Sequence, residues 1–377
     1  MSEITLLHGQ YQGVIFTVSI NEELLVQLTQ ANGIGGNEGQ IRQLFKDATK
    51  DVAETFLEDG LGGVFAQHTG KADGPRVMIA GHMDEVGFMV SQITDKGFLK
   101  FVPIGGWWSQ VVLAQQVTIT TRDGKTFHGV TGSKPPHVLS AEARKQPVDL
   151  QDVFVDLGAS SKEEVLSWGI RPGDMITPYI ETRRLNGTPF LLGKAWDNRI
   201  GVAVAIEVLR ELVVSGHDTV LFSGANVQEE VGLRGAKAAT HLLRPDITIA
   251  LDTGTAGDTP GMTPKEADSE LGKGPQVIIY DASMIAHKGL REFVIDIAEE
   301  ENIPFQYTFI TGGGTDAGAQ HQSLDGIPSI AITIPVRYLH SHTSMIHEDD
   351  YKNTIRLVTA IIKRLNHESV QQIRDNA

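Results

Sequence analysis

The sequence predicts an α/β protein in which a mostly parallel sheet is flanked by helices and carries a small inserted β-domain. From residue 76 onward, short apolar runs alternate with segments of helical period, the pattern of a parallel sheet covered on both faces. Residues 97–180 are instead rich in Val, Thr, Gly and Pro and show little helical period. The length of 377 residues is also that of two domains rather than one.

The elements of the α/β part follow one another along the chain. Residues 76–80 (RVMIA) are an apolar run short enough for a buried strand, and residues 198–215 place Ile200, Val204 and Val208 near one helix face. The further strands that we expect lie at 219–227, 247–252, 275–280, 305–310 and 329–335. The further helices lie at 236–243, 288–301 and 348–366.

The inserted part has its own signals. An Asp-Gly pair within 121–125 (TRDGK) is typical of a hairpin turn. We therefore expect residues 88–184 to form a small β-barrel-like domain, and residues 1–87 and 185–377 to form one discontinuous catalytic α/β domain. Residues 1–20 match no clear element.

Composition excludes several classes of function. The 32 basic and 47 acidic residues give a charge of −15, which argues against nucleic acids and anionic membranes as partners. Cysteine is absent, so any metal must be held by His, Asp and Glu. No apolar run approaches the ~18 residues of a membrane span, and the first 20 residues lack the basic start of a signal peptide. We expect a cytoplasmic protein.

Familiar catalytic motifs are missing. His347 and His367 each precede a glutamate but lack the second histidine of His-Glu-x-x-His. Residues 33–38 approach a dinucleotide fingerprint, but Glu38 replaces its third glycine and the segment follows a helix-like run. We expect a loop there, with Asn37 capping the next helix.

Side chains that can bind metal follow four predicted strands, and a fifth such group opens the long helix. Ligands bind beyond the carboxyl ends of the strands in open α/β sheets, so these side chains should meet. The candidates are His82, Asp84, Asp197, Glu229, Glu230, Asp252, His340 and His342.

Each candidate also has an ordinary structural explanation. A single histidine such as His82 is more often a satisfied polar residue than a ligand, and two adjacent glutamates are usually solvated. Asp197 most simply caps a helix, Asp252 a turn, and His340 and His342 could lie on the surface. The metal site is favoured because, without it, all of these separate explanations would have to be true at once, and all of them at strand ends.

The charges suit two cations. Two histidines and three carboxylates, with Asp197 bridging, give −3 against +4, and one hydroxide brings the sum to zero. Nitrogen and oxygen ligands fit zinc, cobalt or manganese better than magnesium or copper(I). His82 and Asp84 point to the same side of an extended chain, so Asp84 could orient the His82 ring. One further glutamate then remains as a general base.

These motifs resemble the glutamyl-aminopeptidase and tetrahedral-aminopeptidase family of dinuclear metallopeptidases, which is deblocking-aminopeptidase-like and has members labelled cellulases. The similarity runs from about residue 22 to the C-terminus and implies a zinc-exopeptidase-like fold with two zinc or cobalt ions per subunit. Nothing in the chain resembles a glycosidase carboxylate pair. The segments that carry the similarity are 81–88, 195–199, 227–236, 256–261, 312–317 and 337–341.

The resemblance also implies roles for the residues. Glu229 would be the general base, Asp84 would orient His82, and residues 312–316 would lie near the pocket for the first substrate side chain. It implies a cis bond from Asp197 to its successor, and His340 rather than His342 as a ligand. The implied ligand sets are His82, Asp197 and Asp252 for one ion, and Asp197, Glu230 and His340 for the other.

The implied reaction is removal of N-terminal residues from short peptides by a metal-bridged water. Dimers formed through the β-insert would build a dodecamer of tetrahedral symmetry, and the adjacent Trp107 and Trp108 favour a covered surface on that insert. Two alternatives stay open. A related dinuclear deacylase or carboxypeptidase would grip a substrate carboxylate with a guanidinium, and a non-catalytic assembly protein would use the β-insert alone.

Overall fold

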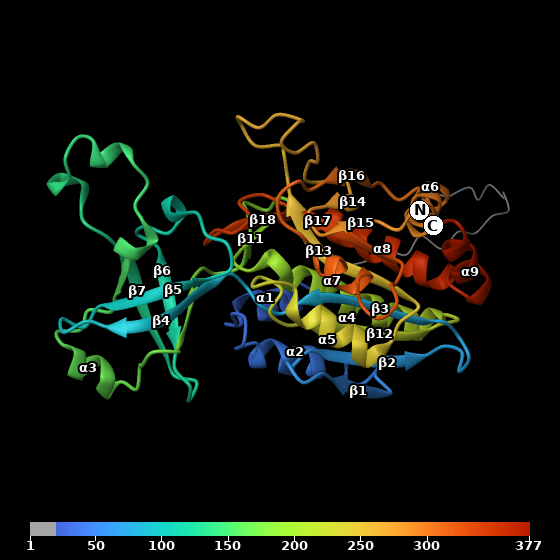
Figure 1. Ribbon diagram of the computed structural model, residues 1–377, viewed down its shortest axis with the longest axis horizontal. Helices are drawn as coiled ribbons and strands as arrows, with labels where there is room; N and C mark the ends of the chain where they lie inside the picture. The colour runs from blue at the N-terminus through green and yellow to red at the C-terminus, as the bar shows by residue number, and fades with distance from the viewer. Residues whose placement is uncertain (1–19) are drawn as a thin grey trace, which may run out of the picture.

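The computed structural model describes residues 20–377, which form a large sheet covered by helices and a smaller closed β-barrel beside it (Figure 1). The barrel strands lie between residues 87 and 178, whereas the strands of the large sheet come from both sides of this range. The barrel is therefore inserted into the sequence of the α/β part, and the predicted fold class is confirmed. No helix among residues 20–377 is long and apolar enough to cross a membrane.

Four parallel strands form the centre of the large sheet, and they lie in the order β12 (Val220–Asn226), β3 (Arg76–His82), β13 (Ile247–Thr255) and β17 (Ser329–Val336). They are almost entirely buried, which explains their continuous apolar runs. Antiparallel pairs flank this centre, so the sheet as a whole is mixed. The outer strands are β1 (Thr55–Glu58), β2 (Val64–Thr69), β14 (Gln276–Asp281), β15 (Met284–Ile285) and β16 (Gln306–Phe309).

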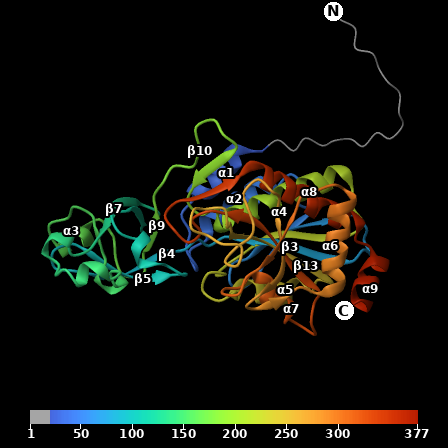
Figure 2. The same ribbon diagram turned by 90° about the horizontal axis from the view of Figure 1, so that it is seen from above.

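Helices cover both faces of the sheet (Figure 2). Helix α4 (Trp196–Ser215) runs across the centre of one face, where it packs on β3, β12 and β13 and buries Ile200, Val204 and Val208. This arrangement brings the start of α4 to the carboxyl ends of the central strands. The helices beside α4 are α1 (Glu22–Gln30), α2 (Gly39–Thr49) and α8 (Glu348–Arg364). Helices α5 (Arg234–Leu243) and α7 (Asp316–His321) lie on the other face of the sheet. Helices α6 (Lys288–Glu300) and α9 (His367–Asp375) pack against each other.

The barrel closes through six strands. Its interior holds apolar side chains such as Phe88, Val117 and Ile176, all fully buried. The Asp-Gly turn is confirmed, because Gly124 has a φ of +81° between two paired strands. The strands in barrel order are β4 (Gly87–Ile93), β5 (Leu99–Ile104), β8 (Phe154–Asp156), β7 (Thr126–Gly132), β6 (Gln116–Thr120) and β9 (Met175–Pro178). Helix α3 (Lys162–Ser167) flanks the barrel.

A small sheet and two details of helix capping complete the fold. Strands β10 (Arg183–Arg184), β11 (Phe190–Gly193) and β18 (Ser344–His347) form the third sheet. The expected cap of α2 at Asn37 is wrong, because the capping position is Glu38 and no side chain makes the cap bond. Asp197 does not cap α4 either, because the chain is non-helical at Asp197 and Asn198, and it is Asn198 Oδ1 that accepts the N–H of Gly201 at 3.0 Å. The extension expected before residue 20 lies outside the described residues.

Candidate metal centre

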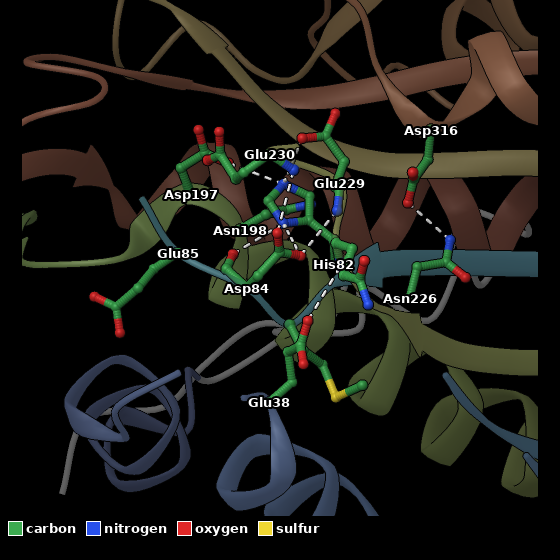
Figure 3. A network of polar contacts seen from close by, with 12 residues as sticks. Glu38, His82, Asp84, Glu85, Asp197, Asn198, Asn226, Glu229, Glu230 and Asp316 are labelled. Atoms are coloured by element: carbon green, nitrogen blue, oxygen red, sulfur yellow. Dashed lines mark hydrogen bonds and ion pairs between the residues drawn. The ribbon is translucent and has the colours of Figure 1, made fainter. Parts of the chain in front are cut away.

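The predicted ligands converge at the carboxyl ends of the central strands, and Figure 3 shows part of this group. They come from five different elements, each of which leads one side chain into the same space. The predicted ligands are His82 at the end of β3, Asp252 near the end of β13, Glu230 just beyond β12, His340 just beyond β17 and Asp197 at the kinked start of α4.

Asp197 lies between the two imidazoles. Its Oδ1 is 3.2 Å from Nε2 of His82, and its Oδ2 is 3.2 Å from Nε2 of His340. Each oxygen of one carboxylate thus faces a different histidine, the arrangement of a bridging ligand. The peptide bond from Asp197 to Asn198 is cis, as the resemblance implied.

Two further carboxylates complete two sets of three side chains, each made of one imidazole, Asp197 and one other carboxylate. Asp252 Oδ1 is 3.7 Å from Nε2 of His82, and Glu230 Oε2 is 3.4 Å from Nε2 of His340. Donor atoms bound at about 2.0–2.2 Å to one ion are separated by distances of this size. His82, Asp197 and Asp252 form one compact donor group, and Asp197, Glu230 and His340 form another. His82 with Glu229 and Glu230 makes a third combination.

The hydrogen bonds of the two histidines leave lone pairs facing carboxylate oxygens. Nδ1 of His82 donates to the main-chain oxygen of Asp84 at 3.0 Å, and Nδ1 of His340 donates to that of Gly106 at 3.0 Å. When neutral, each ring therefore presents an unprotonated Nε2 to Asp197. Two facing lone pairs are repulsive unless a proton or a cation lies between them.

Unpartnered oxygens point to the same conclusion. Oδ1 of Asp197 and Oε1 of Glu230 are buried without a hydrogen-bond partner among the described residues. Buried polar atoms of this kind are costly unless something binds them. The donor set therefore fits divalent cations, and it lacks the thiolates that other zinc sites use.

The pKa values show how crowded the negative charge is. Burial, with the nearby Asp197 charge, raises the pKa of Glu230 to about 8 and that of Asp252 to about 8. Burial alone would lower the pKa of His340, but the Asp197 and Glu230 carboxylates raise it to about 9. Near neutral pH these raised pKa values keep protons on His340, Glu230 and Asp252 in the metal-free site, and a cation bound among them would displace those protons.

Asp84 holds the chain around the site rather than only the His82 ring. Its carboxylate accepts the main-chain N–H groups of Glu229 at 3.0 Å and Glu230 at 3.2 Å (Figure 3). Its Oδ1 is 3.4 Å from His82 Nδ1, while the main-chain oxygen makes the shorter contact. Asp84 is fully buried, so it fixes two strand ends against each other.

Sequence reasoning missed a second buried network next to the site. The Arg199 guanidinium is fully buried and donates to the main-chain oxygens of Met83, Leu28, Ala31 and Gly33, as well as to Glu85. Lys194 donates to both oxygens of Glu85 at 2.7 and 2.8 Å. The sequence did offer one sign of this network, because all three charged residues stand inside or beside the motifs at 81–88 and 195–199.

A cleft of about 690 Å³ opens over the donor groups. Of the segment 312–316, the residues 312–315 line this cleft, and Asp281 holds them by accepting the N–H and hydroxyl of Thr315. The cleft is also lined by Lys265 and its neighbours from the loop after β13. A segment of a peptide fits a cavity of this size.

Of the other candidates, His342 lies apart from the donor groups, whereas Glu229 lies outside only the two groups that share Asp197. His342 is 5% exposed, packs its ring 5.5 Å from that of Trp107, and has no hydrogen-bond partner for either nitrogen among the described residues. Glu229 is also buried, and burial raises the pKa of its carboxyl well above the usual value. Trp107 is half-buried against the barrel, while Trp108 is 62% exposed, so only the second is free to cover a partner.

Imidazoles and carboxylates gathered at the strand ends of an α/β sheet, below an open cleft, fit a metal-dependent hydrolase. Residues 62–357 match the M42 glutamyl aminopeptidase family. The chain belongs to this family of metal-dependent peptidases.

Similar proteins extend over almost the whole chain. The glutamyl aminopeptidase of Lactococcus lactis subsp. cremoris is 38% identical over 92% of this chain and 97% of its own. A TET aminopeptidase structure from a marine sediment Thaumarchaeota archaeon has a TM-score of 0.91 and 42% identity, covering 93% and 98% of the two chains. The TET1 peptidase of Pyrococcus horikoshii, which can assemble into a tetrahedron or a large octahedral shell, has a TM-score of 0.82 and 33% identity, covering 91% and 99%.

Proposed function

We propose that this peptidase is a dinuclear metal-dependent aminopeptidase that removes N-terminal residues from short peptides. The observation that carries the proposal is the position of Asp197, whose two oxygens face two different imidazoles at 3.2 Å. His82 with Asp252 would complete one site, and Glu230 with His340 the other. Zinc or cobalt suits these imidazole and carboxylate donors.

Two divalent cations in these sites would acidify a water and polarise the scissile carbonyl. Glu229 would serve as general base toward this water and then as general acid toward the leaving amine. Its main chain is fixed by Asp84, and it lies outside the two donor groups that share Asp197. Because burial raises the pKa of its carboxyl, Glu229 can accept a proton from water and return it to the leaving amine.

The charge of the cleft favours a free amino terminus. Besides the proposed ligands and Glu229, the carboxylates of Glu266 and Asp268 line the cleft, and their charges would favour an α-ammonium. Among the described residues that line the cleft, Lys265 carries positive charge and none is an arginine. A deacylase or carboxypeptidase that grips a substrate carboxylate with a guanidinium has less support.

The test compares three forms of one peptide series: unmodified, N-acetylated and C-amidated. We expect the chelated protein to be inactive. Zinc or cobalt should restore hydrolysis of the unmodified and the C-amidated peptides, with no action on the N-acetylated ones. Preferred cleavage of the N-acetylated form would favour the deacylase, and a requirement for a free C-terminus would favour the carboxypeptidase.

We also propose that residues 88–184 act as an assembly domain that pairs subunits and builds a closed dodecamer. The exposed Trp108 supports this, since aromatic residues are enriched at the cores of interfaces. A TET1 relative of 33% identity assembles into closed particles. Light scattering decides between the states: the mass of one 40.9 kDa chain would reject assembly, and a stable dimer would reject only the particle.

A further inference from the structure

His340 differs from the other proposed ligands in how it is held. Its side chain is 37% exposed, whereas those of His82 and Asp252 are 2% and 8% exposed. It also lies in a loop beyond β17, at a positive φ of 52°, rather than within a strand or helix. Packing alone therefore restrains this ring less than the others, and its orientation depends on a specific partner.

The partner comes from the barrel. Nδ1 of His340 donates to the main-chain oxygen of Gly106, 234 residues away in sequence, in the segment that follows barrel strand β5. This bond sets the tautomer, so that Nε2 presents its lone pair to Asp197 and Glu230. Outer hydrogen bonds of this kind orient metal-binding histidines.

Two glycines let the segment approach so closely. A Cβ on Gly106 would lie 3.2 Å from His340 Nδ1. Gly105 has a φ of +82°, and a Cβ there would lie 2.7 Å from Val86 and 3.2 Å from Oε2 of Glu230. The backbone of the segment therefore lies directly against one donor group.

Trp107 fixes the segment from the other side. Its Nε1 donates to the main-chain oxygen of Gly87 at 3.0 Å, and its ring stacks on Phe88 of β4 with centroids 4.7 Å apart. The same ring lies 5.5 Å from that of His342, two residues beyond His340. A single side chain thus joins the barrel wall, the glycine segment and the histidine loop.

We propose that residues 105–107 are a positioning element for His340, so that binding of one of the two cations depends on how the barrel is seated on the α/β part. The inference rests on the proposed dinuclear site. The cation held by Asp197, Glu230 and His340 requires the carbonyl of Gly106, and the cation held by His82 and Asp252 does not.

The test measures cobalt binding to the metal-free full chain, by calorimetry and by the visible absorption of bound Co(II). Trp107→Ala should weaken one of two binding events about 10–100-fold, the usual effect of losing an outer partner of a metal ligand. Trp107→Phe keeps a stacking ring but loses the N–H donor, so its loss should be smaller. Trp108→Ala, at the exposed neighbour, is the matched control and should bind both ions normally.

Gly106→Ala tests the contact without disturbing the barrel core. The added methyl lies against the His340 ring, so the same single event should weaken and its Co(II) spectrum should change. Gly60→Ala is the control, because a Cβ there meets no atom within 4 Å. Normal binding of both ions by Gly106→Ala and Trp107→Ala would overturn the inference. Fewer than two ions on the unmodified chain would instead overturn the dinuclear site itself.

Discussion

Replacing Glu229 by glutamine tests the proposed division of labour in the site. The substitution preserves the shape of the side chain but removes its ability to accept a proton. Glu229 Oε2 is 3.7 Å from His82 Nε2, and the main chain of Glu229 is held by Asp84, so the structure around it should survive. Neither donor group that contains Asp197 includes Glu229. The variant should therefore keep both metal equivalents.

The expected loss is in turnover. General acid–base catalysis contributes about 10²–10⁴-fold, which corresponds to about 2.7–5.4 kcal/mol of transition-state stabilisation at 1.36 kcal/mol for each tenfold. In our proposal Glu229 accepts one proton and later delivers it, so kcat should fall toward the upper end of this range. KM should change much less, because a neutral amide of the same size occupies the same place.

The assay is steady-state hydrolysis of a panel of aminoacyl anilides, with metal content measured on the same samples. Glu230→Gln is the matched control, since it makes the same chemical change one residue further on, at a proposed ligand. That control should lose about one metal equivalent. A Glu229→Gln protein with near-normal kcat would remove Glu229 from the mechanism, and one that loses metal would make it a ligand.

His340→Ala should lose about one metal equivalent per chain, whereas His342→Ala should keep both, as elemental analysis of dialysed protein will show. In the metal-free protein, burial raises the pKa of Glu230 from 4.5 and of Asp252 from 3.8, both to about 8. The folded state then binds more protons than the unfolded state between these values, so the melting temperature of chelated protein should fall as the pH rises from about 4 to about 8. Added cation should remove much of this decline. Arg199→Ala deletes a fully buried cation and should lower the free energy of unfolding in urea by about 3–5 kcal/mol.

Each of these expectations has its own contrary result. Metal loss from His342→Ala but not from His340→Ala would exchange the roles of the two histidines. A melting temperature of the chelated protein that rises with pH would contradict the raised pKa values of Glu230 and Asp252. For the arginine, the control is Arg291→Ala, whose ion pair with Glu292 is partly exposed and is worth about 1 kcal/mol or less. Equal losses of unfolding free energy for Arg199→Ala and Arg291→Ala would mean that the buried network stabilises the fold no more than an exposed ion pair does.

Much of the fold could be predicted because its central strands are buried on both faces. Continuous apolar runs such as that of β3 are direct consequences of this burial, so their positions are visible in the sequence. The donor residues follow such runs at once, which places them at one edge of the sheet. One interpretation failed for a local reason, because Asn37 lies one residue before the capping position. The ordinary explanation of Asp197 as a helix cap, which we did not favour, fails because the chain there is not helical.

The contacts that hold the site could not be predicted, because they join distant parts of the chain through backbone atoms. Nothing in the residue types around Gly106 reveals that its carbonyl meets His340. The burial of Arg199 is likewise a property of the packed helices, since an arginine in a sequence is ordinarily exposed. Asp84 was expected at the His82 ring, yet its carboxylate mainly binds backbone N–H groups beyond β12.

The most direct test of the dinuclear aminopeptidase is a metal titration of the chelated chain, with the products of one unblocked peptide followed by mass spectrometry. We predict no cleavage without metal. As the second equivalent of zinc or cobalt binds, a ladder of products should appear, each shorter by one N-terminal residue. Full activity with a single equivalent, or products shortened from the C-terminus or cut internally, would contradict the proposal.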